Sequence, residues 1–393
     1  MTPAALVTTP VTADLLRGAM AVEPTSRGVL PHRLTAAARR RNTDPGLAFA
    51  EAQPSGVRLV VQTRATVVEL VAHATRRAFV GAPQQPLGLY DLFVDGHPTA
   101  QGPVSGGSTL SIDMTTGAST LTEGEPGSVR FDGLPAHDKT IEIWLPHTEV
   151  TEVIALRTDA PVDPPPASDR RVWVHHGSSI SHGSNAASPS TTWPAVAARL
   201  GGVDLVNLGF GGGALLDPFT ARDIRDTPAD LLSVKVGINV VNLDAMRLRA
   251  FVPAVDGFLD TIQEGHPTTP LLLVTPLLCP IHEDTPGPAV PDAAAMAEGR
   301  VRFRATGDPA DVAAGRLTLR VIRQALADAV ARRAADDPHL HLVDGLALYG
   351  EADYVEHPLP DALHPDAVTH QFVGERFAAT VFGGNGPFAR STR

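Results

Sequence analysis

The chain has 393 residues, of which 43% are hydrophobic and 19% are charged, and it carries a formal net charge of −11 with a pI near 5.7. This length fits two domains better than one core, and the composition excludes a disordered chain. The acidic balance also excludes a nucleic-acid footprint, because the one dense basic run, Arg39–Arg41, is short. We therefore expect no nucleic-acid partner.

The sequence also predicts the compartment. No segment is apolar over the roughly 20 residues that a membrane helix needs, and the first residues lack the charged start and apolar block of a secretory signal. The single cysteine, Cys279, excludes an internal disulfide, and its apolar surroundings favour a buried core residue over a reactive thiol. We expect a cytoplasmic protein with no membrane partner.

The first part of the chain is predicted to be all β. Between residues 47 and 156, short β-rich runs recur between Gly, Pro and Asp, a pattern typical of an antiparallel sandwich or jelly roll. We assign this domain to residues 1–160, although the segment before the first run fits either domain. The runs are V-R-L-V-V-Q-T, L-Y-D-L-F-V-D-G, S-T-L-S-I-D-M, S-V-R-F-D-G-L and T-I-E-I-W-L-P.

A Pro-rich linker at residues 161–171 precedes a change of pattern. From residue 172 to the end at 393, apolar strand candidates alternate with helical ones, which indicates βαβ units and a parallel sheet with helices on both faces. The strand candidates are Val172–His176, Asp204–Leu208, Leu231–Val236, Leu271–Leu278 and Leu340–Val343. The helix candidates are Trp193–Leu200, Ala245–Glu264, Arg316–Ala335 and Ala367–Phe377.

The ends of the first three strand candidates carry the residues suited to chemistry, since ligands of such sheets bind beyond the carboxyl ends of the strands. G-S-S-I-S-H-G at Gly177–Gly183 places serines on a strand-to-helix turn, where a hydroxyl can act as a nucleophile. The glycines of N-L-G-F-G-G-G at Asn207–Gly213 expose backbone N–H groups, and V-G-I-N at Val236–Asn239 adds an amide donor. Together these groups could form an oxyanion hole.

Near the C-terminus, L-P-D-A-L-H-P-D at Leu359–Asp366 supplies an acid and a base. Asp361 and His364 are three positions apart and fit into one turn. Asp361 could then hold the imidazole in one tautomer while the other ring nitrogen faces the serine.

The first of these blocks resembles that of the SGNH hydrolases, also called GDSL esterases and lipases. Their G-D-S-L/I-S/T-x-G pattern is similar to Gly177–Gly183. Ser178 stands where the family usually has aspartate, and Ser179 stands at the nucleophile position.

The other three blocks follow in the family's order. The glycine of the second block corresponds to Gly212, and the G-x-N-D of the third corresponds to Gly237–Asn239, with Val240 where aspartate is common. The D-x-x-H of the last block corresponds to Asp361 and His364. Four blocks in order are a specific signal, whereas one alone is not.

The resemblance implies a fold and a site. It implies a three-layer α/β/α domain of the SGNH type with a flavodoxin-like parallel sheet. The implied nucleophile is Ser179, with His364 as base and Asp361 as its partner, and the implied oxyanion donors are Ser179, Gly212 and Asn239. No cofactor or metal is expected, since no H-E-x-x-H occurs and no Cys joins the histidines at ligand spacing.

Other interpretations of these residues stay open. Ser178 and Ser181 are alternative nucleophiles, and Ser179 on its own fits a helix N-cap. His175 and His176 are expected to fill the end of the first strand. A phosphate-binding turn in the Gly-rich block is disfavoured, because its spacing is not G-x-G-x-x-G.

The Pro- and Asp-rich stretch 281–314 is long for a connector and is either a lid over an acyl or acceptor pocket or a disordered insertion. Phe210, Phe219 and Trp193 are either part of an acyl site or core residues.

Three functions remain. The first is a serine-dependent ester hydrolase acting on a small-molecule or glycoside ester. The second is an O-acyltransferase of secondary metabolism that uses an acyl thioester and a hydroxyl acceptor such as a glycoside, because G-S-S-I-S-H, D-T-P-A-D-L and the domain pairing resemble the two-domain, salicylyl-transferring type of this family. The third is a non-catalytic carbohydrate-binding protein, since the first domain resembles a carbohydrate-binding module; the alternative is a packing domain without a ligand.

Overall fold

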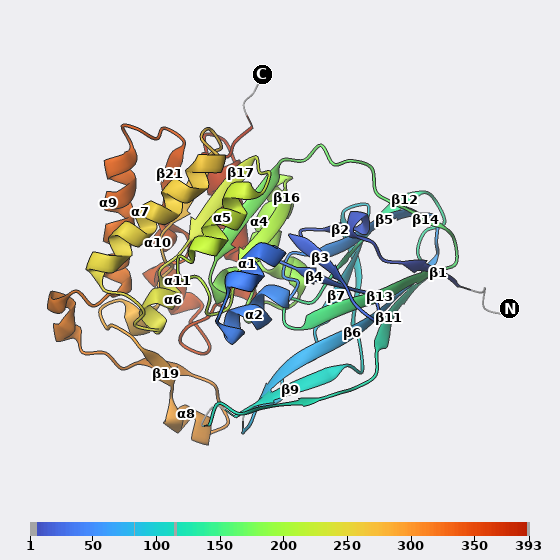
Figure 1. Cartoon of the computed structure of the whole chain (residues 1–393), viewed down its shortest axis with the longest axis horizontal. Helices are drawn as coiled ribbons and strands as arrows, with labels where there is room; N and C mark the ends of the chain where they lie inside the picture. Colours follow the sequence, from blue (N-terminus) through green and yellow to red (C-terminus); the bar gives the residue numbers. More distant parts are fainter. Residues whose placement is uncertain (1–5, 82, 114–115, 391–393) are drawn as a thin grey trace. The chain divides into compact units, whose positions relative to one another are not determined.

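The structure is a computed structural model that describes residues 6–81, 83–113 and 116–390, and it divides into two compact units (Figure 1). The β unit holds the described residues up to Thr35, Glu51–Asp169 and Ser188–Ser190. The α/β unit holds Ala36–Ala50, Arg170–Ala187 and the described residues from Thr191 onward.

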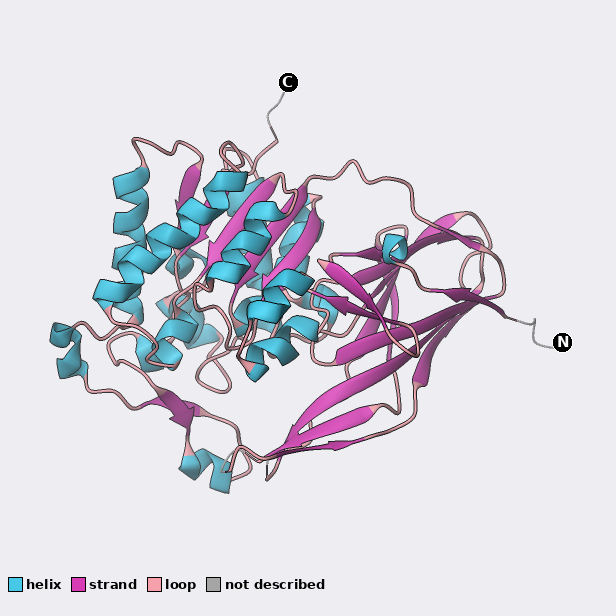
Figure 2. Ribbon diagram, in the orientation of Figure 1, coloured by secondary structure: helices cyan, strands magenta, loops and turns pink. Residues whose placement is uncertain are grey.

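The regular secondary structure of the β unit is almost entirely β-strand (Figure 2). Within its described residues, one sheet contains β1 (Val7–Pro10), β3 (Ala21–Pro24), β4 (Val29–His32), β6 (Val67–Phe79), β9 (Ser108–Ile112), β10 (Ser119–Thr122), β11 (Gly127–Asp132) and β13 (Val150–Thr158). The other contains β2 (Leu16–Arg17), β5 (Arg58–Thr63), β7 (Leu89–Val94), β8 (His97–Pro103), β12 (Lys139–Trp144) and β14 (Val162–Asp163). A short 3₁₀ turn, η1 (Ala13–Leu15), precedes β2.

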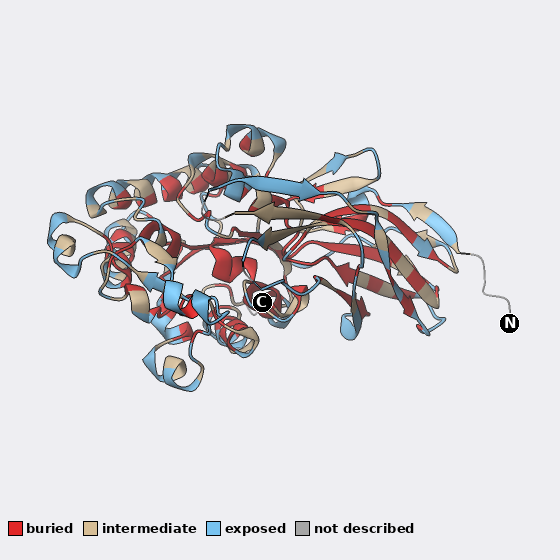
Figure 3. Ribbon diagram, turned by 90° about the horizontal axis from the view of Figure 1, so that it is seen from below, coloured by how far each residue is buried: buried red, intermediate tan, exposed pale blue. Residues whose placement is uncertain are grey.

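Both sheets of the β unit contribute to one apolar core. Leu59 and Ile143 from one sheet and Leu70 and Leu156 from the other are fully buried members of the same cluster. Along β11, buried residues alternate with more exposed ones, as expected where one sheet face is covered, and Figure 3 shows buried residues on the strands of this unit. The five predicted β runs fall on strands, although Met114 lies outside the described residues. The jelly-roll connectivity stays a prediction.

One pairing differs from the expected antiparallel arrangement. β6 and β9 pair in parallel, with Thr75 opposite Ser108. The hairpin of β7 and β8, which separates β6 from β9 in the chain, lies in the other sheet.

The segment 36–50, which the sequence left unplaced within the predicted first domain, clusters with the α/β unit instead. It contains α1 (Ala36–Arg41) and most of α2 (Pro45–Ala52). α1 packs on α5 (Pro218–Asp226), and the buried Leu47 lies so close to Gly213 that a side chain there would meet it at 2.8 Å. Apolar contact rather than chain order decides this placement.

The α/β unit is built on a parallel sheet with the strand order β16-β15-β17-β18-β21. These strands are β15 (Val172–Gly177), β16 (Asp204–Gly209), β17 (Leu231–Lys235), β18 (Leu271–Val274) and β21 (Leu340–Val343), and each neighbouring pair is parallel. In chain order the sequence of strands is 2-1-3-4-5, which is the flavodoxin-like arrangement. The predicted parallel sheet is confirmed.

Helices cover both faces of this sheet. Trp173 of β15 stacks on Phe377 of α12 (Ala367–Phe377) at a centroid distance of 5.3 Å. His176, three residues later and on the opposite face, stacks on Phe258 of α7 (Leu248–Gly265) at 5.6 Å. Trp193 of α4 (Trp193–Gly201) joins the Trp173 side, so the unit has three layers.

The remaining helical segments of the described α/β unit are short, apart from α9 (Leu319–Arg333). They are α3 (Ser179–His182), α6 (Ile238–Asn242), α8 (Ala293–Ala297), α10 (Gly345–Leu348), α11 (Glu351–Glu356), the 3₁₀ turns η3 (Pro280–His282) and η4 (Pro309–Ala314), and the π turn η5 (Ala378–Phe382). A further 3₁₀ turn, η2 (Pro189–Thr191), begins in Ser188–Ser190. Over the described residues, no helix combines the length and apolar character that crossing a bilayer requires.

Two buried histidines of this fold should make its stability depend on pH. Burial lowers the pKa of His176 to about 4 and that of His370 to about 4. The unfolded chain has a histidine pKa near 6.5, so the stability is complete above about pH 6.5 and declines toward pH 4, by at most about 1.4 kcal/mol per pH unit for each histidine.

We expect His176→Leu to flatten this decline in urea unfolding measured at pH 7 and pH 5. His339→Leu, which changes a partly exposed histidine of the same unit, is the matched control and should keep the wild-type slope. An unchanged slope in His176→Leu would contradict the assignment.

Candidate active site

The turn after β15 presents three serines, and the structure separates their roles. Ser178 is the N-cap of α3, and its Oγ accepts a hydrogen bond from the N–H of Ile180 at 3.3 Å. Serine and aspartate are both good N-caps, so Ser178 can perform the capping that an aspartate would perform at this position. Its hydroxyl is committed to the helix.

Ser181 belongs to a buried network below the turn. Its Oγ lies 2.8 Å from Nε2 of His175, whose Nδ1 lies 2.7 Å from Oγ of Ser233. The indole N–H of Trp173 donates to the same Ser233 oxygen at 2.8 Å. Burial lowers the pKa of His175 well below its ordinary value, so the ring is neutral. This series of hydrogen bonds joins α3 to the sheet.

Ser179 is the serine that meets the C-terminal block. Its Oγ lies 2.9 Å from Nε2 of His364, and Nδ1 of His364 lies 2.7 Å from Oδ2 of Asp361. The side chains of His364 and Asp361 are each 14% exposed. The structure thus brings together the three residues that the sequence assigned to catalysis, in a continuous chain of hydrogen bonds.

The carboxyl of Asp361 is ionised in this arrangement. Burial by itself raises its pKa, but the hydrogen bond and charge of His364 and the backbone N–H groups of Leu363 and His364 outweigh burial, so the pKa lies below its usual value. A carboxylate accepts the Nδ1–H of the neutral imidazole. That tautomer leaves Nε2 free to accept the Ser179 hydroxyl.

Two contacts from other segments hold the turn that contains Asp361 and His364, which we call the catalytic turn. The sequence indicated neither contact. The N–H of Phe303 donates to the carbonyl of Asp361 at 2.9 Å, and Sγ of Cys279 lies 3.5 Å from the carbonyl of Ala362. Ala362 has a φ of +67°, a left-handed conformation that is unfavourable for a residue with a Cβ. These contacts help to hold that conformation.

The three expected oxyanion donors lie in three segments. The N–H of Ser179 is in the first turn of α3, where no intrahelical acceptor exists. Gly212 adopts a φ of +77° in the loop after β16, and a side chain on Gly211 would lie 4.0 Å from Cβ of Ser179. Oδ1 of Asn239 accepts the N–H of Ala214 at 3.1 Å, which orients Nδ2 as the donor.

Gly237 is the N-cap of α6, the helix that carries Asn239. Its φ of +126° is a glycine conformation, and a Cβ would meet Ile322 at 2.7 Å and Pro276 at 2.9 Å. Val240, where the family often has aspartate, is fully buried, so it packs in the core.

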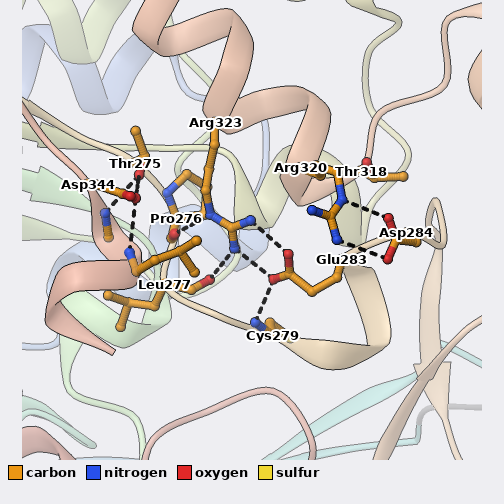
Figure 4. Close-up of polar contacts among 12 residues, drawn as sticks. Thr275, Pro276, Leu277, Cys279, Glu283, Asp284, Thr318, Arg320, Arg323 and Asp344 are labelled. Atoms are coloured by element: carbon orange, nitrogen blue, oxygen red, sulfur yellow. Dashed lines mark hydrogen bonds and ion pairs between the residues drawn. The ribbon is translucent and has the colours of Figure 1, made fainter. Parts of the chain in front are cut away.

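A partly buried ion pair holds the loop that carries Cys279 (Figure 4). Arg323 of α9 binds both carboxylate oxygens of Glu283 at 2.7 Å and also donates to the carbonyls of Pro276 and Leu277. Glu283 in turn accepts the N–H of Cys279 at 3.0 Å. Bidentate geometry of this kind fixes orientation as well as charge, so the loop after β18 is firmly positioned.

The aromatic residues considered for an acyl site divide into two groups. Phe210 and Trp193 are buried in the core, where Phe210 packs near His176 and Trp193 contacts His175 edge to face. Phe219 is half-buried. Among the described residues, no three His, Cys, Asp or Glu side chains gather so as to hold a metal ion.

Comparison with known proteins agrees with this geometry. Residues 170–278 match the family described as GDSL-like lipase/acylhydrolase. Residues 170–278 thus form a GDSL-like lipase/acylhydrolase domain, the type that the SGNH resemblance implied. No curated protein sequence matches this chain significantly.

Solved structures extend the similarity beyond the family segment. The salicylyl-acyltransferase SsfX3 from a tetracycline biosynthetic pathway is 28% identical with a TM-score of 0.77, and the match covers 96% of each chain. A putative GDSL-like lipase from Bacteroides ovatus is 18% identical with a TM-score of 0.65, covering 95% of this chain and 96% of the other. A family two carbohydrate esterase from Clostridium thermocellum is 14% identical with a TM-score of 0.54, covering 83% and 91%.

The chain is therefore an enzyme of the ester-acting serine hydrolase or related O-acyltransferase class.

The environment of Cys279 makes a simple prediction. Its side chain is 2% exposed, and burial raises its pKa far above the ordinary thiol value, so no thiolate is available in the folded protein. We expect Ellman's reagent to detect no thiol in the native enzyme and one thiol per chain in urea. Rapid reaction of the native enzyme would show that the loop after β18 opens.

Proposed function

We propose that the chain is a serine-dependent ester hydrolase that acts through an acyl-serine intermediate at Ser179. The observation that carries the proposal is the unbroken hydrogen-bond chain from Ser179 through His364 to Asp361. Such a chain converts a weakly nucleophilic hydroxyl into an attacking group. The same chain argues against a non-catalytic carbohydrate-binding protein.

Acylation begins when Oγ of Ser179 attacks the ester carbonyl and passes its proton to Nε2 of His364. The imidazolium that results is stabilised by the carboxylate of Asp361, 2.7 Å from Nδ1. The protonated imidazole then donates its proton to the leaving alcohol. An ester bond to Ser179 replaces the substrate's ester bond.

Negative charge develops on the former carbonyl oxygen during each half-reaction. The N–H groups of Ser179 and Gly212 and the Nδ2 amide of Asn239 are the proposed donors to it. Their orientation is set by the α3 N-terminus, the loop after β16 and the bond from Ala214, so little reorganisation is needed. Water, deprotonated by His364, then releases the acid and restores Ser179.

A second candidate is an O-acyltransferase that moves an acyl group from a thioester to a hydroxyl acceptor such as a glycoside. It is favoured by the match to SsfX3, which extends over 96% of both chains and so includes the β unit. Products distinguish the two: water yields a free acid, and a hydroxyl acceptor yields a new ester. In either case we propose that the β unit and the α/β unit are distinct domains, as the sequence division into 1–160, the linker 161–171 and the catalytic domain 172–393 predicts, except that residues 36–50 go with the α/β unit.

Replacement of the nucleophile tests the proposal directly. We expect a fluorophosphonate to add one adduct to the wild type and none to Ser179→Ala, whose kcat should fall roughly 10⁴- to 10⁶-fold because the attacking group is missing. Intact-mass spectrometry measures the adduct. Ser181→Ala removes a serine of the buried network instead and should retain the adduct; an adduct that survives Ser179→Ala would place the nucleophile elsewhere.

The amide donor makes a second prediction. Asn239→Ala should lower kcat by about 10²–10³ with little change in KM, because the donor acts on charge that exists only in the transition state. Asn239→Asp keeps the acceptor for the Ala214 N–H but loses the donor, so it should be at least as slow. Activity of Asn239→Asp near that of the wild type would exclude the donor role.

A further inference from the structure

The insertion 281–314 is an ordered arm of the α/β unit. β19 (Ala289–Pro291) and β20 (Phe303–Ala305) pair antiparallel, with α8 between them. The N–H of Asp292 donates to the carbonyl of Arg302 at 2.8 Å and closes the end of the pair. The alternative of a disordered insertion is wrong, and a specific contact with the site becomes possible.

The base of the arm packs against α6, the helix that carries the proposed oxyanion donor Asn239. Arg316 donates to the carbonyl of Gly287 at 3.4 Å and pairs with Asp244, which follows α6 closely. A side chain on Gly287 would overlap the carbonyl of Val241 in α6. The arm therefore starts at the helix that carries Asn239.

The far strand of the arm reaches the catalytic turn. The N–H of Phe303 donates to the carbonyl of Asp361 at 2.9 Å, and its ring lies edge to face with the imidazole of His364, at a centroid distance of 6.1 Å and an angle of 77°. Edge-to-face contact is a favoured geometry for two rings. A single residue thus contacts the turn through its backbone and the base through its side chain.

We propose that the Phe303 ring is a positioning and acceptor-selecting element: it holds the imidazole of His364 and keeps water from its flank. The inference rests on the proposed function. An apolar ring against the imidazole occupies space that water would otherwise fill, and it restricts rotation of the base.

The consequence concerns the second half-reaction. The acceptor's oxygen forms a bond to the acyl carbon while its proton passes to Nε2 of His364, the bond to Oγ of Ser179 breaks, and that proton returns to Oγ. Water and alcohols compete in this step. A wall that lowers the local supply of water favours an alcohol that other contacts hold in place.

Phe303→Ala tests the ring alone, because the backbone bond to Asp361 remains. The assay uses a p-nitrophenyl ester with methyl β-D-glucoside as the probe acceptor and measures kcat, KM and the ratio of free acid to acylated glucoside. We expect kcat to fall about tenfold, less than the roughly 10² that a 1 Å misplacement produces, and the acid-to-ester ratio to rise several-fold. Phe303→Leu, which keeps an apolar side chain, should restore much of both and serves if the alanine variant folds poorly.

The matched control is Arg304→Ala, which changes the exposed neighbour whose side chain points to the other face of β20. It should leave kcat and the ratio unchanged. A folded Phe303→Ala with wild-type kcat and ratio would overturn the inference alone, provided that Ser179→Ala abolishes both products. Turnover that persists in Ser179→Ala would overturn the proposed function and this inference with it.

Discussion

The hydrogen bond between Ser179 and His364 joins two segments that are 185 residues apart, and the arrangement of the site depends on it. Neither partner could hold the other without a rigid frame. Part of that frame is His370 of α12, whose Nδ1 accepts the N–H of Trp193 at 3.3 Å and whose Nε2 lies 2.9 Å from the carbonyl of Ser184. α12 is thereby tied to both α4 and the end of α3, so the segment before it, with His364, is held at the serine turn.

Buried polar groups supply much of this rigidity. His175, His176 and His370 are fully buried and kept neutral, and each bonds to a neighbouring strand or turn. The Arg323–Glu283 pair adds two partly buried charges that satisfy each other, and Arg323 also satisfies two loop carbonyls. Because an unpaired buried polar group is costly, each of these bonds restricts the backbone to few alternatives. As a result, the segments around the His364 imidazole are held in place by buried or partly buried hydrogen bonds.

Local patterns predicted the strands and helices of the α/β unit and the sequence blocks of the site, but not the contacts that other segments make with the site. The strand at Val172–His176 and the helix at Ala367–Phe377 were recognisable because periodicity reports which side of an element is covered. Phe303 and Cys279 left no such signal, because one backbone N–H and one thiol contact depend on where a loop lies rather than on residue type. The parallel β6–β9 pair and the placement of residues 36–50 were hidden for the same reason.

By itself, the sequence determined the class of the fold, the family and the four blocks in which reactive residues would be found, since these depend on residue type and spacing along the chain. Only the tertiary structure decided which of the three serines faces the imidazole and which residues from other segments contact the imidazole and its turn. Hydrogen bonds and ring contacts act over a few ångströms in space, and spacing along the chain does not encode that proximity when the partners lie on different loops.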